Sequence, residues 1–238
     1  MRDVTLTVYR FDELLQISQE RIVKEHGELY YNSLDLEPIF IDTLMHELGF
    51  TPRLTHSIGD YELDYVNLSG SIKRHYHLFH KILQDYPETR KAYRDYGLTP
   101  FKVVNKVSSA FSDASAVSFC GDNDSFFELK DRIQTEIDNL ASSDADSDDF
   151  KQEQLDSEDL SLLLTQLEEQ NKQIECRLAE KLYETACSLE KLGLAEIAHV
   201  QSADYVKEMC ELNEYEFMAN GDPFKRGSYT QRVIKDTE

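Results

Sequence analysis

A long run of leucines at helical spacing constrains the fold of this chain more than any other feature. Between Glu158 and Leu192, apolar residues recur at steps of three and four, the period of one face of an α-helix. The run predicts the longest helix of the chain, which Gly193 is placed to end or kink. The apolar face has two interpretations: it packs against the rest of the chain, or it forms a seam with a second copy or another protein.

Before this run, alternating and helical patterns follow one another. Residues 4–10 alternate apolar and polar side chains and predict a half-buried N-terminal strand. A helix with Asp12 as its N-cap is expected to run to about Tyr30. A second helix is expected from near Leu36 to a stop at Gly49.

The middle of the chain predicts a small antiparallel sheet. Two strand-like runs, 53–58 and 61–68, are joined across Gly59-Asp60, which is a hairpin signal. From Ser71 the pattern becomes helical and ends before Pro87. Further strands are expected over 101–107 and 116–120, and helices over 88–96, 125–140 and, capped by Ser202, 203–212. Together these elements predict an α+β fold that is richer in helix than in strand.

Acidic residues outnumber basic ones, but very unevenly along the chain. There are 46 Asp and Glu against 25 Lys and Arg, a formal net charge of −21. Residues 107–170 hold 17 acidic and 3 basic residues, whereas residues 71–106 hold 3 acidic and 8 basic ones. A chain this acidic repels a nucleic-acid duplex along its length and is repelled by an anionic membrane. Direct nucleic-acid and membrane partners are therefore not expected.

The densest acidic stretch, Ser142 to Asp159, has few apolar residues to bury and repels itself. It predicts a mobile loop or linker, or else a charged surface that faces a partner. The expected organisation is an α+β domain over 1–140, an acidic loop or linker over 141–157, and a helical region over 158–238 that packs on the first domain or on a partner. The residues expected to bind a partner are acidic residues of this stretch and three residues of the long helix: Asp144, Asp146, Asp148, Asp149, Glu153, Asp156, Glu158, Asp159, Tyr183, Leu189 and Leu192.

The sequence contains no motif that predicts catalysis. His75, His77 and His80 are close together, but His75 and His77 would lie about 200° apart around a helix, so the three cannot converge from one helix on a metal ion. The four cysteines lack Cys-x-x-Cys spacing and fit reduced thiols. Phosphate-binding loops, nucleophile elbows and dinucleotide fingerprints are absent. We expect a non-enzymatic protein without cofactor or metal; the competing hypothesis is a hydrolase that uses these histidines with distant carboxylates.

Two blocks near the ends of the sequence carry a family resemblance. The first runs from Val8-Tyr9-Arg10-Phe11-Asp12-Glu13-Leu14 to Tyr61-Glu62-Leu63-Asp64-Tyr65, and the second from Ser202-Ala203-Asp204-Tyr205 to Asn213-Glu214-Tyr215-Glu216-Phe217. In order and spacing they resemble a widespread family of small acidic bacteriophage proteins, mostly of unassigned function, some of them labelled antitoxins by similarity. The acidic stretch and the basic segment between the blocks depart from that pattern. The resemblance implies a phage-encoded accessory protein and no catalytic residue.

These observations lead to one leading hypothesis. It is a phage-encoded, non-enzymatic inhibitor that blocks a protein interface of a host anti-phage defence complex of the restriction, BREX or CRISPR type. The expected partner exposes a basic surface, as a nucleic-acid-handling ATPase does. No apolar run is long enough to span a bilayer and no signal peptide precedes the first pattern, so the expected location is the host bacterial cytoplasm. The alternatives are a DNA mimic that competes with nucleic acid and an antitoxin-like neutraliser of a basic toxin; a homodimer is also open.

Overall fold

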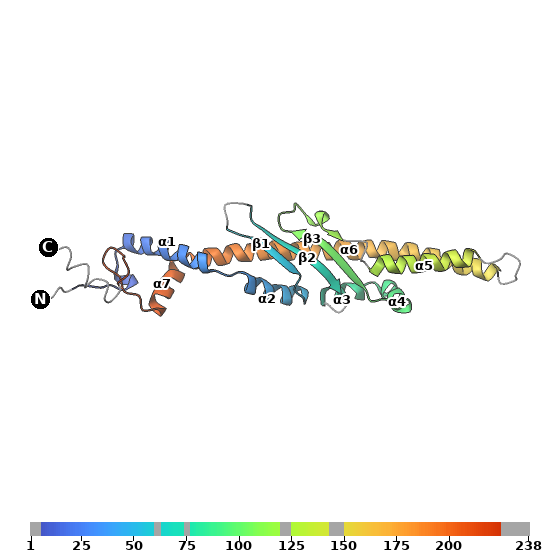
Figure 1. Cartoon of the computed structure of the whole chain (residues 1–238), viewed down its shortest axis with the longest axis horizontal. Helices are drawn as coiled ribbons and strands as arrows, with labels where there is room; N and C mark the ends of the chain where they lie inside the picture. The colour runs from blue at the N-terminus through green and yellow to red at the C-terminus, as the bar shows by residue number, and fades with distance from the viewer. Residues whose placement is uncertain (1–5, 60–62, 74–76, 120–124, 143–149, 225–238) are drawn as a thin grey trace. The chain divides into compact units, whose positions relative to one another are not determined.

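The computed structural model describes residues 6–59, 63–73, 77–119, 125–142 and 150–224 (Figure 1). The chain divides into two compact units. The terminal unit combines residues 1–35 with 193–238, and the central unit contains residues 36–192. The domain boundaries predicted after residues 140 and 157 both fall inside the central unit, so they do not coincide with this division.

A four-stranded antiparallel sheet in the order β1-β2-β3-β4 lies at the middle of the central unit (Figure 1). Its strands are β1 (Arg53–Ser57), β2 (Tyr65–Lys73), β3 (Phe101–Ser108) and β4 (Ser118–Phe119). The pairing of β1 with β2, in which Thr55 lies opposite Asn67, confirms the predicted hairpin. The helix predicted from Ser71 is wrong at its start, because β2 pairs with β3 as far as Lys73. The helix that follows begins at His77.

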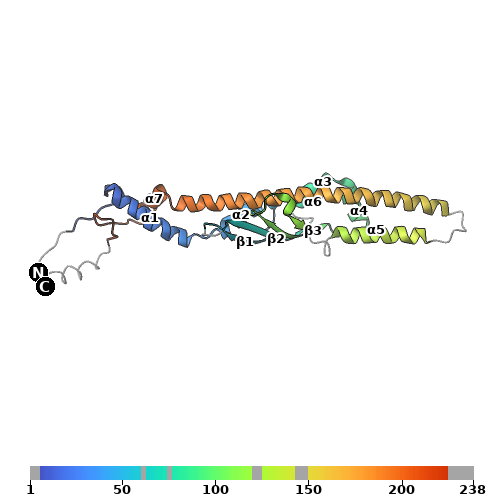
Figure 2. The ribbon, with the colours of Figure 1, turned by 90° about the horizontal axis from the view of Figure 1, so that it is seen from above.

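Five helices of the central unit have the bounds α2 (Glu37–Leu48), α3 (His77–Gln84), α4 (Pro87–Asp95), α5 (Ser125–Ala141) and α6 (Phe150–Val200). Gly49 ends α2 with a φ of 75°, the left-handed conformation that glycine adopts without strain, as predicted. Figures 1 and 2 show α6 running along one face of the sheet. The α+β class, the small antiparallel sheet and the long C-terminal helix are therefore confirmed.

The long helix extends beyond its predicted limits at both ends. It begins at Phe150, inside the stretch predicted as a loop or linker over 141–157. Acidic residues are favourable near the start of a helix, where they offset the positive end of its dipole. The helix also continues through Gly193 to Val200, so glycine does not end it. Gly193 is buried, and packing at this position overrides its low helix propensity of about 1 kcal/mol.

Helices α5 and α6 lie side by side in the central unit (Figure 2). Leu129 and Ile133 of α5 and Leu167 of α6 have no exposed side-chain surface, and they share one apolar cluster with Tyr93 of α4. A buried leucine contributes about 1.5–3 kcal/mol relative to an exposed one. The leucine pattern of α6 thus packs first of all against its own chain.

The terminal unit is built around α1 (Gln16–Ser33) and α7 (Ala203–Leu212), with a short 3-10 helix, η1 (Phe11–Glu13), before them. Its core contains side chains from both ends of the sequence: Phe11, Leu14, Ile22, Val206, Cys210 and Phe217. Ser202 caps α7 as predicted, since its Oγ accepts a hydrogen bond from the Tyr205 amide at 3.2 Å.

Two predictions for the start of the chain need correction. Residues 6–10 form no regular strand; Tyr9 alone pairs, in an antiparallel bridge with Phe217. Asp12 does not cap the first α-helix, because it lies within η1 and α1 starts at Gln16. The two hydrogen bonds between Tyr9 and Phe217, of 2.9 and 2.8 Å, fix this segment to the C-terminal part of the sequence instead.

Candidate functional site

The predicted partner-binding carboxylates lie in and just before the first turns of α6. Asp144, Asp146, Asp148 and Asp149 lie outside the described residues, and Glu153 belongs to α6. Asp156, Glu158 and Asp159 are exposed on α6. Asp156 therefore lies on a regular helix and not in the loop or linker predicted over 141–157, whereas Glu158 and Asp159 lie on the helix that the sequence predicted from Glu158.

The other three predicted residues lie farther along α6 and are occupied within the chain. Leu189 has no exposed surface, so it offers nothing to a partner. Tyr183 is half-buried, and its hydroxyl donates a hydrogen bond to the Phe111 carbonyl at 3.1 Å. Leu192 is half-buried. The prediction of a partner seam is wrong for Leu189, which is buried inside the molecule, and it stays a prediction for Tyr183 and Leu192, which are partly exposed.

We call residues 125–169, which comprise α5, the first part of α6 and their connection, the acidic hairpin. This segment holds 14 acidic and 3 basic residues. Two of its bases form ion pairs on the helices: Lys130 with Glu168 at 2.5 Å, and Arg132 with Glu128 at 2.5 Å. The third base is Lys151. The three bases of the hairpin can therefore neutralise only a small part of its 14 acidic residues.

The four strands show the opposite composition. None of their residues is Asp or Glu, and they carry Arg53, Lys73, Lys102 and Lys106. The basic character of residues 71–106 was visible in the sequence, where Lys73 was assigned to a helix and Lys102 and Lys106 to a strand over 101–107. In a chain with 30% charged residues, about 7 of the 24 strand residues would be expected to be charged. Only four are charged, and all four are basic, so the sheet differs from the rest of the chain in both the number and the sign of its charges.

Lys102 is the one strand cation that the covered side of the sheet encloses. Its side chain is 1% exposed, and its Nζ lies 2.8 Å from Glu175 Oε1 on α6. Asn171 donates a hydrogen bond to the same oxygen at 3.0 Å, and the Phe126 ring lies 5.3 Å from the ammonium. A buried ammonium requires such a partner, because an unpaired charge in the interior is strongly unfavourable. This group joins β3 to α6 and is a structural contact.

A groove of about 400 Å³ lies between α3 and α6. Arg177 pairs with Asp85 at 2.6 Å, and Lys181 pairs with Glu47 at 2.8 Å across it. The Lys181 ammonium lowers the pKa of the Glu47 carboxyl by a hydrogen bond and by charge. Opposite charges from the two sides thus largely neutralise each other, and the lining residues carry a surplus of only one acid.

The histidines that suggested a metal site do not converge among the described residues. His75 lies outside them, His77 is exposed at the start of α3, and a ring nitrogen of His80 is 3.1 Å from the Gln84 amide. Within the described ranges, no three His, Cys, Asp or Glu side chains are placed to hold a metal ion.

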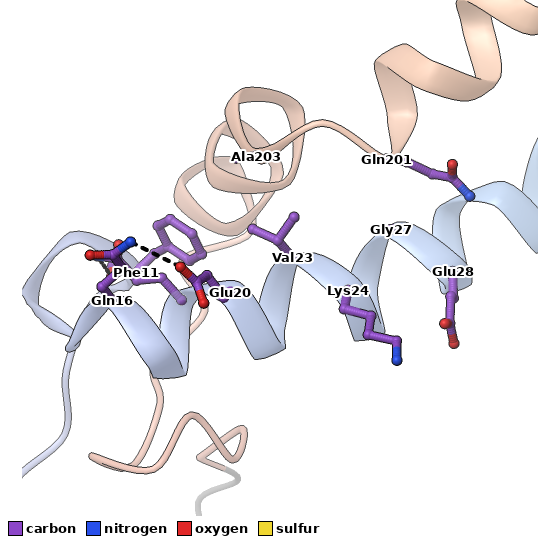
Figure 3. A pocket seen from close by; sticks show the side chains of 10 residues that line it. Phe11, Gln16, Glu20, Val23, Lys24, Gly27, Glu28, Gln201 and Ala203 are labelled. Carbon is purple, nitrogen blue, oxygen red and sulfur yellow. Dashed lines mark hydrogen bonds between the residues drawn. The ribbon is translucent and has the colours of Figure 1, made fainter.

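The terminal unit contains a cleft of about 500 Å³ along α1 (Figure 3). Phe11 and Val23 give it an apolar floor, and Glu20 and Lys24 stand at its rim (Figure 3). Gly27 lets the backbone at Gln201 approach, since a Cβ added there would lie 3.3 Å from Gln201 Cα. The cleft suits a small apolar group, and its rim carries both signs of charge.

Comparison with protein-family models, with curated protein sequences and with solved structures finds no match to this chain. The resemblance to the phage family therefore stays a prediction. In the described part of the molecule, no helix has the length and apolar character needed to cross a bilayer.

Proposed function

We propose that this protein is a non-enzymatic inhibitor, encoded by a bacteriophage, that acts in the host cytoplasm by binding a basic surface of an anti-phage defence complex and blocking a protein interface. The observation that carries the proposal is the acidic hairpin, with 14 acidic residues against 3 basic ones in 45 positions. Glu158, Asp159 and Glu169 are exposed on its second helix, and Asp131 and Asp138 on its first.

A helical scaffold makes these carboxylates a better ligand than a disordered acidic tail. The α5–α6 pair is held by a buried apolar cluster, so its exposed carboxylates are already positioned before a partner arrives. Preorganisation reduces the conformational entropy lost on binding. Carboxylates on such a surface form short, charge-assisted hydrogen bonds with arginine, often in pairs.

The surplus negative charge also accelerates the encounter with a basic partner. Electrostatic steering raises association rates by 10-fold or more at low salt and is lost as ionic strength rises. Proteins that handle nucleic acid expose basic surfaces for the same reason. A host complex of that kind therefore fits the hairpin in sign of charge, and a bulky acidic protein on such a surface would exclude the complex's own subunits.

Affinity capture from infected host cells tests the proposal. The tagged full-length protein is expected to retain a subunit of a defence complex, and purified protein is expected to prevent that complex from assembling. Glu158→Gln combined with Asp159→Asn should weaken binding about fivefold at 50 mM salt and little at 500 mM, since each exposed ion pair contributes less than about 1 kcal/mol. The matched control is Asp42→Asn with Glu208→Gln, two exposed acids on α2 and α7.

The same assay distinguishes the other candidate functions. Release of the partner by duplex DNA would favour a DNA mimic over an interface blocker. Retention of one small basic protein that is toxic when produced alone would favour an antitoxin-like role. Equal loss of binding in the test and control variants would contradict a specific role for the acidic hairpin.

A further inference from the structure

One face of the sheet is covered by helices, and no helix of the described residues covers the other. On β2, Val66, Leu68 and Ile72 are buried, whereas the alternating residues between them are partly or fully exposed. Figure 1 looks onto this second face, with the strands drawn in front of α6. We call it the open sheet face; its residues are Arg53, Thr55, Tyr65, Asn67, Ser69, Ser71, Lys73, Phe101, Val103, Asn105 and Lys106.

Three cations are distributed over this face. Arg53 on β1 lies opposite Ser69 on β2. On the other side of Ser69, the strand pairing shifts by one residue, so that Asn105 and Lys106 of β3 both lie against it. Arg53 and Lys106 are thus two strand spacings apart, about 10 Å, and Lys73 lies about 13 Å farther along β2.

These cations are not neutralised within the described part of the chain. Arg53, Lys73 and Lys106 are exposed, and none of them has an ion-pair or hydrogen-bond partner among the described residues. Two acids near these strands in the sequence have other hydrogen-bond partners: Asp64 accepts a hydrogen bond from the Gly59 amide, and Asp113 accepts one from the Ser115 amide. The open sheet face therefore carries a local charge of +3 in a protein of net charge −21.

The rest of the face supplies flat aromatic surface and neutral hydrogen-bonding groups. Phe101 lies beside Lys73 in the β2–β3 pairing and is partly exposed, and Tyr65 is partly exposed at the other end of β2. The span between these ends is about 26 Å along the strand. Thr55 and Ser71 contribute hydroxyl groups in between.

We propose that the open sheet face binds single-stranded nucleic acid. Arg53 and Lys106, about 10 Å apart, and Lys73, about 13 Å farther along β2, form a cationic track for the phosphates of an extended strand, and a partly exposed aromatic ring beside a lysine is a platform on which a base stacks. An acidic peptide would satisfy the cations but leave the aromatic rings without a stacking partner. This proposal does not depend on the proposed function, because it uses a different surface.

The net charge does not prevent such binding. Charges separated by more than about 8 Å of solvent are largely screened at physiological ionic strength, so the cations nearest the strand dominate its interaction. The sequence-based expectation of no direct nucleic-acid partner followed from the total charge and from the repulsion of a duplex, and the proposal departs from it for a short single strand. A short single strand on an acid-free sheet has far fewer repulsive neighbours.

Fluorescence anisotropy with a labelled 12-nucleotide oligothymidylate and an oligouridylate of the same length tests the proposal on the full chain. Binding is expected at 50 mM salt and should weaken about 20-fold at 200 mM, as the release of counterions from three phosphates of a single strand implies. Arg53→Ala with Lys73→Ala and Lys106→Ala should abolish that salt dependence. Phe101→Leu, which keeps an apolar side chain but removes the ring, should weaken binding about 10-fold.

The matched control is Lys24→Ala with Lys172→Ala and Lys191→Ala, which removes the same charge from exposed helical positions. This variant should bind the oligonucleotides as the unaltered protein does, and circular dichroism verifies that each variant is folded. No binding at 50 mM salt, or equal losses in the sheet and control variants, would overturn the proposal. Equally tight binding of poly-glutamate in place of the oligonucleotides would also overturn the proposal, because the open sheet face would then bind polyanions in general and not nucleic acid in particular.

Discussion

The sheet and the acidic hairpin of the central unit have opposite charge and different architecture. The strands contain no acidic residue, and their side chains alternate between a buried face and an open one. The hairpin contains 14 acidic residues and exposes most of its polar side chains along two helices. Helix α6 takes part in both, because its first turns belong to the hairpin and its middle covers the sheet.

This difference shows why a single figure for net charge says little about partners. At −21, the whole protein is expected to repel polyanions and attract polycations. At the scale of a binding surface, the hairpin matches that expectation and the open sheet face reverses it. Two partners of opposite charge can therefore be accommodated on one unit without competing for the same residues.

The largest effect is expected where the two regions are joined by a buried charge. Glu175→Gln removes a counter-charge at 2.8 Å from the buried ammonium of Lys102 and should lower the free energy of unfolding by about 3 kcal/mol. Urea denaturation followed by circular dichroism measures the change. Lys102→Met in the Glu175→Gln background should recover most of it, because no charge is then buried.

Lys73 gives the matched control on the opposite face of the same sheet. Because it is exposed and unpaired among the described residues, Lys73→Met should change stability by less than about 0.5 kcal/mol. If Glu175→Gln had an equally small effect, the two faces of the sheet would not differ in the way described above.

A smaller or similar loss is expected inside the acidic hairpin. Leu167→Ala removes a side chain with no exposed surface from the α5–α6 cluster and should cost about 2–3 kcal/mol. Leu162→Ala, at a site that is 60% exposed on the same helix, should cost less than about 0.5 kcal/mol. Equal effects in thermal or urea denaturation would mean that the two helices are not packed as described.

The smallest effect is expected at Tyr96, whose hydroxyl donates a hydrogen bond to Glu136 of the hairpin at 2.6 Å. Burial and this hydrogen bond raise the pKa of Tyr96 well above 10 in the folded protein. The unfolded chain therefore releases the proton first, and stability should fall as the pH rises above 10. Tyr96→Phe should cost about 1 kcal/mol at pH 7 and flatten the alkaline decline.

Tyr215→Phe is the control for that alkaline effect. Its ring is 42% exposed in the terminal unit, so this variant removes a tyrosine hydroxyl that is far less enclosed and makes no contact with Glu136. An alkaline decline that persists in Tyr96→Phe but disappears in Tyr215→Phe would contradict the assignment.

Local patterns predicted elements that depend on neighbouring residues, and missed those that depend on distant ones. The stop of α2 at Gly49 and the cap of α7 at Ser202 follow from the conformations these residues favour, and both were predicted. Ser71 to Lys73 were assigned to a helix because the apolar spacing continues through Ile72. Their strand conformation comes from pairing with β3, which lies about 30 residues later in the sequence. Such distant pairing does not change the local spacing of apolar residues, so the spacing could not predict it.

The candidate surfaces divide in the same way. The surplus of carboxylates before and within α6 could be counted from the sequence, and so could the basic character of residues 71–106. The burial of Lys102 could not, because its environment is set by Glu175 on a helix 73 residues later in the chain. The open sheet face likewise became apparent only when strand register placed Arg53, Lys73 and Lys106 on one side.

The terminal unit is assembled from both ends of the sequence, and this has a consequence for biosynthesis. Ile22 and Phe11 find their apolar neighbours on α7, which the ribosome makes last. At about 5–20 residues per second, translation of the intervening segment takes roughly 10 s or more, and during that time the apolar side chains of the first helix lack their packing partners on α7. A cell that produces this protein must therefore tolerate, or protect with chaperones, a nascent chain whose N-terminal segment exposes apolar side chains until the C-terminal segment has been synthesised.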